Sequence, residues 1–381
     1  MNLVLGLRFS VSPFLHEWNG EQSMMSGKVV VGMSGGVDSS VAAYLLKEQG
    51  YEVIGVTMQI WQEEALHVQE ENGGCCGLSA VEDARRVADH LGIRYYVMNF
   101  REEFQKHVID YFVGEYRKGR TPNPCIACNH FVKWESLLQR SLEIGADSIA
   151  TGHYARIERL ANGRYALRKS VTAAKDQTYA LYGLTQEQLA RTHMPVGDYE
   201  KDDVRRIAGE VGLPVACKPD SQEICFVPDG DYAAFIERET GRADEAGNFV
   251  DIHGNVLGVH QGITHYTIGQ RKGLGLAMGH PVFVTEIRPE TREVVIGESE
   301  DVFRTTLRAS GLNFMSVPEF DGGVRAVAKI RYNHRGDDCS VRMVGRDTVE
   351  VVFDRPQRAV TPGQAVVFYD GEYVMGGGTI Q

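Results

Sequence analysis

The sequence has no apolar run that approaches the roughly 20 residues of a membrane-spanning helix, so we expect no membrane partner. It also lacks a basic stretch ahead of its short apolar start, which argues against a secretory signal peptide. An apolar fraction of 43% and a mean hydropathy of −0.25 are typical of a soluble globular protein, and we expect a cytoplasmic one. We interpret residues 1–27 as a disordered extension or the product of a misassigned start codon, because folded sequence begins at Lys28.

Cysteines are few, and their number is odd. The seven are Cys75, Cys76, Cys125, Cys128, Cys217, Cys225 and Cys339. This number, in a long chain without a signal peptide, argues against a framework of structural disulfides and for reactive or metal-binding thiols in a reducing compartment. We expect Cys217 and Cys339 to be packing residues. Because adjacent cysteines seldom both bind one ion, we place Cys75 and Cys76 in a flexible loop near the phosphate-binding segment described below.

An excess of positive charge is missing as well. The net charge is −11, which for the chain as a whole opposes a nucleic-acid partner. The charge is uneven, however. Residues 221–303 hold 6 Lys and Arg against 14 Asp and Glu, a net of −8, whereas residues 304–381 hold 10 against 9, a net of +1. Since the acidity is concentrated in one segment, the composition still allows a basic groove elsewhere.

Apolar runs alternate with amphipathic stretches between residues 28 and 155. This pattern predicts strands at 28–33, 52–58, 94–100 and 147–153, and helices at 39–50, 79–92 and 102–119. Ser79 and Glu82 are spaced as a capping box, and Gly92 marks the end of that helix. Strands and helices in alternation predict a doubly wound parallel sheet of the α/β class.

The pattern changes after residue 155. A hairpin that turns at Asn162-Gly163 is predicted first, followed by short helices at 185–193 and 201–212. From about residue 226 the chain is rich in loops and glycine, and from about 304 short alternating strands predict an antiparallel β-barrel. We therefore divide the chain into four parts, namely an extension, an α/β domain, a small central domain and a C-terminal β-barrel, at residues 1–27, 28–225, 226–303 and 304–381.

The first predicted strand runs directly into the segment SGGVDS, residues 34–39. Glycines allow a tight turn, and the helix that follows offers free N–H groups and its positive dipole end to an anion, so we predict a phosphate cradle. The Walker A pattern and the dinucleotide-binding pattern G-x-G-x-x-G are both absent here. The glycines at 273–279 come closer to the second pattern but do not join a predicted strand to a helix. The alternative is an ordinary glycine turn before a capped helix.

A second segment, TPNPCIACN at residues 121–129, pairs two cysteines with two prolines. Each proline restricts its own backbone and that of the residue before it. We therefore expect Cys125 at the end of a stiff extended run and Cys128 near the start of the next helix. A C-x-x-C pair can bind zinc, bind an iron–sulfur cluster or carry out thiol chemistry, and this segment alone does not choose among them.

These motifs carry a resemblance to a known family. VVVGMSGGVDSSVAAYLL resembles the PP-loop of ATP pyrophosphatases, which cleave ATP between its α- and β-phosphates and pass AMP to an oxygen of the substrate. The chain also has TPNPCIACN, TGHYA, AAKDQTYAL, DSQEICFV, TIGQRKGLG, KIRYNHRG and TPGQAVVFYDGE. With these it resembles the bacterial tRNA-specific 2-thiouridylases from Gly32 to the C-terminus. The NPC-x-x-CN and SQEIC pair makes the resemblance specific.

The resemblance implies ATP-dependent 2-thiolation of the wobble uridine, position 34, of tRNA, with Mg²⁺ accompanying ATP and Asp38 as an indirect ligand of that ion. It implies as partners the tRNAs for Lys, Glu and Gln, and a cysteine desulfurase or sulfur-relay protein as sulfur donor. Cys225 would carry a persulfide and Cys128 would be the other catalytic thiol, the two being left as a disulfide after turnover.

The resemblance also implies two sets of binding residues. Those expected to bind ATP are Gly32, Met33, Ser34, Gly35, Gly36, Val37, Asp38, Ser39, Met58 and Gly152. Those expected to bind tRNA are Asn123, Pro124, Cys125, His153, Lys175, Asp176, Gln177, Arg331, Tyr332 and Gln364. Gln270, Arg271 and Lys272 are polar and loop-borne, and they suggest a further RNA contact. For single residues plainer interpretations exist: core packing for Met58, a buried apolar thiol for Cys225, and a strand face for KIRYNHR.

The chemistry explains why two cysteines are needed. Adenylation turns the C2 oxygen of uracil into a good leaving group, and a persulfide carries sulfur in bound form. Releasing that sulfur requires a second thiol to attack the S–S bond. Some family members have Asp where this chain has Cys125, which puts an acid/base role for that position in doubt.

Three alternatives stay open at this point. Cys125, Cys128 and Cys225 together could hold a [4Fe–4S] cluster whose fourth iron position binds sulfide. The chain could be another PP-loop synthetase, which would need no paired catalytic cysteines. It could also be a non-catalytic tRNA-binding or sulfur-carrier module, against which the intact SGGVDS segment argues.

Overall fold

The computed structural model describes residues 27–60, 78–220, 224–320 and 322–381. The expectations for residues 1–26 and for Cys75 and Cys76 lie outside these ranges. The first sheet is parallel and five-stranded, in the order β3-β2-β1-β4-β7. Its strands are β1 (Lys28–Gly32), β2 (Glu52–Gln59), β3 (Arg94–Asn99), β4 (Ser148–Ala150) and β7 (Thr192–His193). This confirms the predicted doubly wound α/β fold.

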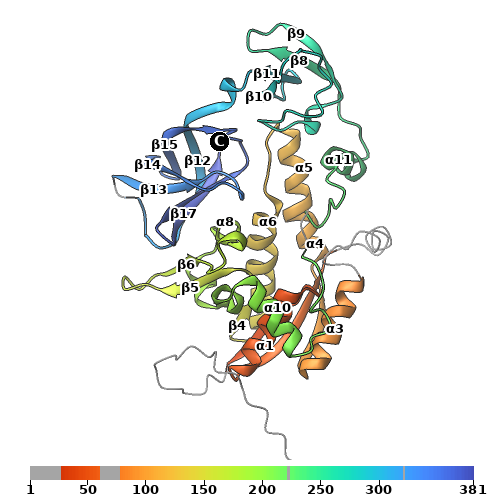
Figure 1. Cartoon of the computed structure of the whole chain (residues 1–381), viewed down its shortest axis with the longest axis vertical. Coiled ribbons are helices and arrows are strands. Elements are labelled where there is room, and N and C mark those ends of the chain that lie inside the picture. The colour runs from red at the N-terminus through yellow and green to blue at the C-terminus, as the bar shows by residue number, and fades with distance from the viewer. Residues whose placement is uncertain (1–26, 61–77, 221–223, 321) are drawn as a thin grey trace, which may run out of the picture.

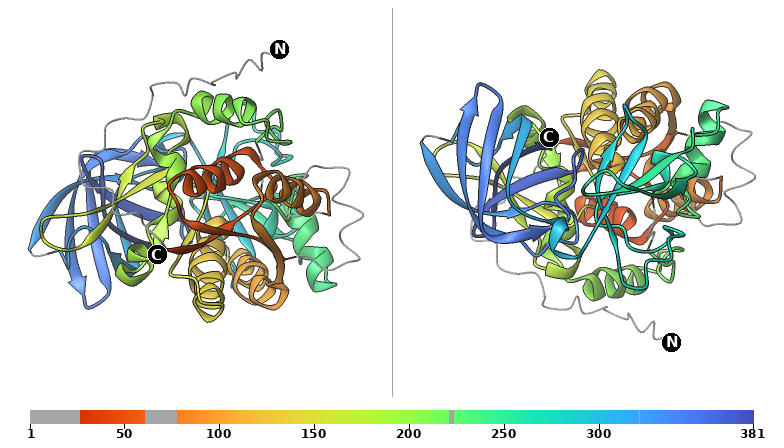
Figure 2. Two further views of the ribbon diagram at one scale, coloured as in Figure 1. Left: turned by 90° about the horizontal axis from the view of Figure 1, so that it is seen from below. Right: turned by 90° about the horizontal axis from the view of Figure 1, so that it is seen from above.

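Helices cover both faces of this sheet (Figures 1 and 2). One face carries α1 (Val37–Glu48), α3 (Leu78–Leu91) and α10 (Lys201–Glu210). The other carries a helix that runs through α4 (Arg101–Phe104), η1 (Gln105–Ile109) and α5 (Asp110–Arg117), and one that runs through α6 (Pro124–Ala127), η2 (Cys128–Leu137) and α7 (Leu138–Glu143). Neighbouring residues of β1 divide between the two cores, Val29 and Val31 facing one and Val30 the other. This is the period-2 alternation of a strand that is buried on both sides.

Two local predictions in this domain are wrong. Ser79 is not a cap, because the described part of α3 already includes Leu78. Cys125 is not at the end of an extended run, since helix α6 begins at Pro124. The reason is that proline fits the first helical position, where its missing N–H is not needed, and that Asn123 caps the helix.

The link to the barrel begins with the predicted hairpin, β5 (Ala155–Arg159) and β6 (Tyr165–Lys169). Gly163 has a φ of +83° at its turn, as Asn-Gly turns require. Short helical segments follow at η3 (Ala173–Lys175), α8 (Thr178–Leu181), α9 (Gln186–Ala190) and η4 (Pro195–Asp198). The hairpin joins the C-terminal sheet, because β6 pairs with β17 through Tyr373 and Arg168.

The C-terminal strands form the predicted antiparallel barrel, whose order is β12-β15-β14-β13-β16-β17 and which closes through pairing of β12 with β17. The strands are β12 (Phe303–Phe314), β13 (Gly323–Lys329), β14 (Asp337–Gly345), β15 (Thr348–Arg358), β16 (Ala365–Asp370) and β17 (Tyr373–Ile380). KIRYNHR is not a strand face, because β13 ends at Lys329 and leaves Arg331 and Tyr332 in the loop before β14.

The central region has more regular structure than its glycine content suggested. It contains α11 (Tyr232–Thr240) and a four-stranded sheet in the order β10-β11-β8-β9. Those strands are β8 (Gly247–Asp251), β9 (Val256–His260), β10 (Phe283–Arg288) and β11 (Glu293–Gly297). They surround a small core that includes Phe249, Tyr266 and Val294. Figure 1 shows the four-stranded sheet beyond the end of α5 and next to the barrel, with α11 beside α5.

Candidate functional site

The loop after β1 has the shape of an anion cradle. The cap of α1 is Gly36, so no side chain occupies the N–H groups of the first turn. The Ser39 hydroxyl accepts a hydrogen bond of 3.2 Å from the Ser34 N–H, and the Ser40 hydroxyl donates one of 2.7 Å to the Gly36 carbonyl. These bonds hold the loop closed at its base and leave the positive end of the helix dipole available to an anion.

Two glycines in or beside this loop have no room for a side chain. Gly35 has a φ of +68°, and a Cβ atom there would lie 2.3 Å from the Ala80 carbonyl oxygen. Gly152, just after β4, would place a Cβ atom 2.5 Å from the Ser39 nitrogen. The backbone after β4 therefore touches the loop directly, and the two expected ATP-binding segments are brought together.

A cluster of charges lies beside the loop. Lys201 donates to Asp38 Oδ1 at 2.7 Å and pairs with Asp220 Oδ1 at 2.8 Å, and Tyr154 Oη also donates to Asp38 Oδ1 at 2.8 Å. Lys175 and Arg205 pair with Asp220 at 2.9 Å each. Burial raises the pKa of Asp220, but Lys201 and Lys175 outweigh it and hold that pKa below its ordinary value. Asp220 is therefore a carboxylate held among three cations.

Lys218 forms a second tie at the loop. Its ammonium donates to the Gly35 carbonyl at 3.1 Å and to Asp83 Oδ2 at 2.6 Å. Sequence reasoning missed Lys201, Lys218 and Asp220 as neighbours of the loop. The signal available was the motif around Cys225, since KPD directly precedes SQEIC in the chain.

Two methionines expected to contact ATP occupy different environments. The Met33 side chain is buried in the core, and its carbonyl accepts a hydrogen bond of 2.7 Å from Thr57 Oγ1. Met58 lies at the end of β2, partly buried against the opposite core. The Met33 N–H also donates to the Val56 carbonyl at 2.8 Å, so both backbone groups of Met33 are hydrogen-bonded within the protein. Met58 instead combines a packing position with a strand end, where ligands of parallel sheets bind.

The two cysteines of the C-x-x-C segment lie on one continuous helix. The Asn123 side chain accepts from the Cys125 and Ile126 N–H groups at 3.1 and 3.2 Å, which starts α6 at Pro124. Cys125 is exposed and Cys128 is half-buried. From Cys128 the helix continues as the π-helical stretch η2, a form that is frequent at functional sites.

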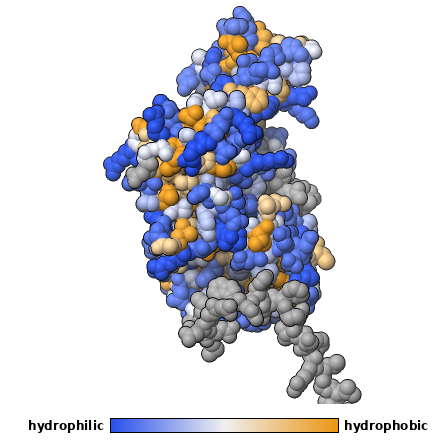
Figure 3. All heavy atoms as spheres, turned by 60° about the vertical axis from the view of Figure 1, so that its left-hand side comes forward, coloured by the Kyte–Doolittle hydropathy of each residue, from blue (hydrophilic) through white to orange (hydrophobic). Residues whose placement is uncertain are grey.

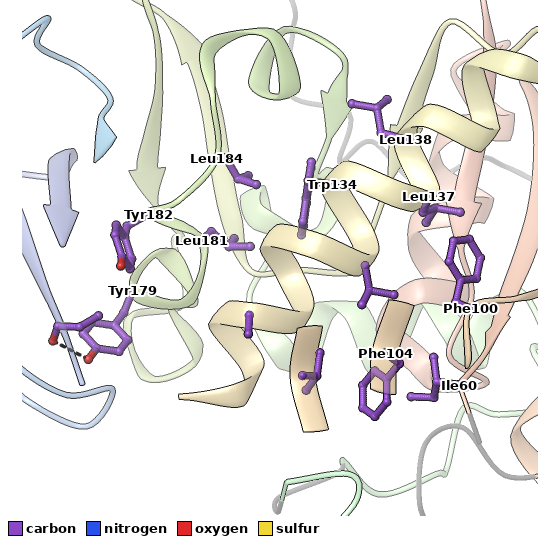
Figure 4. Packing of buried hydrophobic residues seen from close by; sticks show 14 of the residues in the cluster. Ile60, Phe100, Phe104, Trp134, Leu137, Leu138, Tyr179, Leu181, Tyr182 and Leu184 are labelled. Carbon is purple, nitrogen blue, oxygen red and sulfur yellow. Dashed lines mark hydrogen bonds between the residues drawn. The ribbon is translucent and has the colours of Figure 1, made fainter. Parts of the chain in front are cut away.

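The apolar face of this helix packs into a hydrophobic core, which fixes its position. Figure 4 shows Trp134 and Leu137 of η2 between Leu181 and Leu184 on one side and Phe100 and Phe104 on the other. Trp134 is 1% exposed, and its indole N–H donates to Thr192 Oγ1 at 2.8 Å. Burial of such side chains contributes on the order of 2 kcal/mol each, which holds the start of the helix in place.

Cys225 lies on a segment anchored by the next residue. Phe226 is 4% exposed, and its ring packs against Phe104 at 5.9 Å and Phe112 at 5.2 Å. Those rings flank η1, which also contacts α6. Both thiol segments therefore pack against the same helix, and Cys128 and Cys225 both lie half-buried at the edge of one hydrophobic core. Residues 221–223, shortly before Cys225 in the chain, lie outside the described ranges.

The three thiols do not form a metal site in this arrangement. Among the described residues, no three His, Cys, Asp or Glu side chains are grouped closely enough to hold a metal ion. Cys125, Cys128 and Cys225 are therefore not placed as ligands of a single metal ion, and the [4Fe–4S] cluster stays an alternative. Asp38, by contrast, lies at the cradle where a Mg²⁺ ion accompanying nucleotide phosphates would arrive.

His153 follows Gly152 and is held as a neutral imidazole. Burial, together with the Lys133 ammonium, keeps the pKa of His153 well below its ordinary value. Nδ1 is 2.7 Å from Thr151 Oγ1, and Nε2 is 3.5 Å from Lys133 Nζ. Since the ammonium can only donate, Nε2 accepts and the ring proton resides on Nδ1, which donates to Thr151.

The loop after β13 brings the barrel to the C-x-x-C segment. Tyr332 is 40% exposed, and partial burial, Asp176 and Cys125 each raise its pKa. Gln364 donates to the Thr121 and Pro122 carbonyls at 2.9 and 3.3 Å. Two residues expected to bind tRNA thus lie beside the segment expected to meet the target base.

A cavity of about 320 Å³ opens where the three parts of the chain meet. Its wall takes Thr121 from the α/β domain, Thr267 and Gly269 from the central region, and Arg331 and Gln364 from the barrel. Arg331 donates to the Arg358 carbonyl at 2.9 Å, which fixes its guanidinium at the cavity. Gln270 follows this wall in the chain and is half-buried, and Arg271 and Lys272 are exposed, so the further RNA contact stays a prediction.

Lys175, Asp176 and Gln177 are tied within the protein. Lys175 pairs with Asp220, and Asp176 accepts from the Ser170 N–H and the Thr178 hydroxyl. Gln177 Oε1 accepts from the Tyr154 N–H at 2.9 Å. This segment therefore links the charge cluster at the phosphate loop to the region around Tyr332.

The remaining cysteines differ from each other. Cys339 is fully buried in the barrel, and burial raises the pKa of its thiol to about 12, which confirms a packing role. Cys217 is exposed, so the expectation that it packs is wrong. It lies at the surface next to Lys218, whose contacts with the phosphate loop hold this part of the chain.

Three family models match successive parts of the chain. Residues 27–229 match the family described as tRNA methyl transferase HUP domain, residues 233–298 the tRNA methyl transferase PRC-barrel domain, and residues 304–380 the aminomethyltransferase beta-barrel domain. Among the described residues, none of the helices combines the length and apolar character needed to cross a membrane.

Curated relatives match over nearly their whole length. The chain is 69% identical to the tRNA-specific 2-thiouridylase MnmA of Lachnoclostridium phytofermentans over 93% of this chain and 99% of the relative. It is 58% identical to the protein of the same name from Acetivibrio thermocellus and 57% identical to that from Clostridioides difficile, each over 94% of this chain and at least 99% of the relative. The family models are described by methyl transfer, but these full-length relatives are named for sulfur transfer.

Proposed function

The chain belongs to the family of tRNA-specific 2-thiouridylases, and from this premise we propose that it transfers sulfur to C2 of the wobble uridine, position 34, of tRNA at the expense of ATP. One observation supports this above the others. An open phosphate cradle and two half-buried cysteines belong to one domain, with Gly152 against the cradle and both thiol segments packed on the helix of residues 101–117. A PP-loop synthetase that transfers no sulfur would not need the two cysteine segments.

In the first step, the uracil C2 oxygen attacks the α-phosphorus of ATP. The bond to the bridging oxygen breaks, pyrophosphate leaves with the electron pair, and the N3 proton of uracil is released to solvent. The uncapped first turn of α1 and the cations around Asp220 would neutralise the leaving pyrophosphate. Mg²⁺ bound to the phosphates supplies further neutralisation when present.

In the second step, Cys225 carries the sulfur as a persulfide, R–S–SH. The Cys128 thiolate attacks the Cys225 sulfur, a disulfide forms between the two residues, and hydrosulfide is released beside the adenylated base. Hydrosulfide adds to C2 and AMP leaves with its oxygen. A thiol reductant must then reduce the disulfide before the next turnover.

The target base must leave its stack in the anticodon loop to reach these groups, which costs a few kcal/mol in a loop. Asn123, Pro124 and Cys125 would meet it, with Tyr332 and Arg331 available for stacking and phosphate contact. Figure 3 shows mainly hydrophilic side chains on one face of the molecule, with hydrophobic ones in small groups.

The expected substrates are the tRNAs for Lys, Glu and Gln, and the expected donor is a cysteine desulfurase or a sulfur-relay protein. Deleting the gene and analysing tRNA nucleosides by mass spectrometry tests the activity: 2-thiouridine derivatives at position 34 should disappear. Undiminished thiolation in the deletion strain would refute the proposal.

Two rivals give different results with purified protein. A different PP-loop synthetase would release pyrophosphate only with its own AMP acceptor and independently of tRNA, and a non-catalytic binding module would release none with either, whereas the proposed enzyme releases it only with tRNA present. The iron–sulfur alternative is tested by anaerobic purification: iron in stoichiometric amounts that activity requires would support it. Full activity of iron-free protein supports the persulfide route.

A further inference from the structure

Lys133 is a cation whose charge no carboxylate balances in the described part of the chain. Its ammonium donates to Asn129 Oδ1 at 2.9 Å and to His153 Nε2 at 3.5 Å, both uncharged groups. Other lysines near the phosphate loop differ from Lys133, since Lys175, Lys201 and Lys218 each pair with an aspartate. A half-buried ammonium held by two neutral acceptors favours the arrival of an anion.

The position of Lys133 indicates which anion. His153 directly follows Gly152, whose backbone touches the Ser39 nitrogen at the start of α1. On its other side Lys133 is held by Asn129, the residue after Cys128. Lys133 therefore lies between the phosphate cradle and the catalytic thiol, which is where the part of ATP that stays on the uracil must lie between the two steps.

The surrounding contacts fix the ammonium rather than neutralise it. Asn129 is 4% exposed, and its amide donates to the Ala180 carbonyl at 3.0 Å, which leaves its oxygen to accept from Lys133. Thr151 is 5% exposed and accepts the Nδ1 proton of His153, so Nε2 also presents an acceptor. A group held in this way reaches the transition state without reorganising, which is what electrostatic catalysis requires.

We propose that Lys133 binds the α-phosphate of ATP and stays on it through adenylation, so that it stabilises the charge that develops at the α-phosphorus and then the AMP leaving group. The phosphate loop and the cations around Asp220 would bind the β- and γ-phosphates, which leave as pyrophosphate. This inference rests on the proposed function, and it adds a catalytic residue on the thiol-bearing helix. Lys133 makes no covalent bond and transfers no proton in this role.

The first test measures binding, with the full-length protein and no tRNA. AMP carries only the α-phosphate, adenosine carries none, and pyrophosphate carries only the other half. Titration calorimetry gives the Kd of each probe. The ratio of the Kd for adenosine to the Kd for AMP should be about 10- to 100-fold smaller in K133M than in the parent. This is the range for loss of a hydrogen bond to a charged group. Pyrophosphate binding should stay within about 3-fold of the parent, a change below 1 kcal/mol.

The second test measures the step. In a C225S background the reaction stops after adenylation, so tRNA-dependent pyrophosphate release reports that step alone. K133M should slow it by about 100-fold or more, the size expected when one charged transition-state contact is removed. K133R, which keeps the charge, should recover part of the rate. K106M removes an exposed lysine from η1 and serves as the matched control, with release at the parental rate.

The outcomes separate this inference from the proposed function. If K133M keeps the full AMP advantage, or releases pyrophosphate at the parental rate, Lys133 does not bind the α-phosphate. Weaker tRNA binding with unchanged AMP binding would assign Lys133 to a tRNA phosphate instead and overturn the proposal. If the parent itself releases no pyrophosphate with tRNA, the proposed function fails, and this inference with it.

Discussion

The phosphate loop and the two thiol segments belong to one domain but are held in different ways. The loop is defined by backbone contacts: Gly35 and Gly152 lie so close to neighbouring backbone atoms that a single Cβ would clash. The thiols are defined by side chains, with Cys125 exposed and Cys128 and Cys225 half-buried at the edge of the core. Under the proposed function, nucleotide binding would depend on close packing, whereas sulfur transfer would depend on the identity of a few atoms.

The first prediction separates chemistry from fold. C225S should reduce thiolation by more than about 10³-fold, because it removes the sulfur that carries the persulfide. The free energy of unfolding should change by no more than about 1 kcal/mol, since one half-buried atom is replaced. Nucleoside mass spectrometry and denaturant unfolding measure the two quantities. The control is C217S, which changes an exposed thiol and should leave both unaltered; thiolation by C225S at the parental level would remove Cys225 from the mechanism.

The second prediction concerns the glycines of the phosphate loop, where a substitution should lower both the stability of the protein and its binding of ATP. G35A should destabilise the protein by about 2 kcal/mol or more and abolish ATP binding, because alanine is strained at a φ of +68° and its Cβ meets the Ala80 carbonyl. G152A tests the same idea without backbone strain and should weaken ATP binding through the contact with Ser39. Thermal unfolding with and without ATP measures both effects.

A matched control for these glycines is Gly114, inside α5, where a Cβ would meet nothing within 4 Å. G114A should leave ATP binding unchanged and, if anything, stabilise the helix by up to about 1 kcal/mol. If G35A binds ATP like the parent, the loop is not held by close packing and the contrast with the thiol segments is wrong.

The sequence predicted the elements whose signals are local and failed where a tertiary contact decides. Apolar runs alternating with amphipathic stretches, and glycines at the ends of helices, indicated the α/β domain, and short alternating strands indicated the barrel. The structure of 226–303 was underestimated, because four strands of five or six residues with many glycines between them give little periodicity. The helix start at Pro124 was missed because the cap is a side chain of Asn123 that the prolines obscured.

The site shows the same limit. SGGVDS and the cysteine spacing identified the residues that carry a motif, and the structure puts those segments in one domain. Lys201, Asp220 and Lys133 carry no motif of their own, since a lysine or aspartate in an amphipathic stretch is usually a solvated residue. Their proposed roles depend on contacts between residues distant in the chain, 19 positions apart for Lys201 with Asp220 and 20 for Lys133 with His153, which no local pattern encodes.

The third prediction sharpens the comparison at the boundary between the α/β domain and the barrel. Gln364 holds the Thr121 and Pro122 carbonyls just before the C-x-x-C helix. Q364L should lower kcat/KM for tRNA by about 10-fold, equivalent to about 1.4 kcal/mol, because the segment loses two hydrogen bonds and with them its position. ATP binding should not change. Q381L, which removes an exposed amide that donates to Ser310 within the barrel, is the control, and equal kcat/KM for Q364L and Q381L would contradict a positioning role.

The last and smallest predicted effect concerns His153, which lies where the two halves of the comparison meet. Its pKa is lowered in the folded protein, so between about pH 6.5, where an unfolded histidine titrates, and the lower folded pKa only the unfolded state binds the proton. The free energy of unfolding should therefore fall as pH decreases below about 6.5, by up to about 1.4 kcal/mol per pH unit from this group.

H153Q lacks the proton site, so the difference in unfolding free energy between parent and variant should shift by about 1 kcal/mol between pH 7.5 and 5.5. His193 and His260, whose pKa values burial also lowers, are present in both proteins and cancel in that difference. If denaturant unfolding gives the same pH slope for parent and variant, His153 is charged or solvated in the folded protein, and Lys133 would then lack the neutral acceptor that holds it.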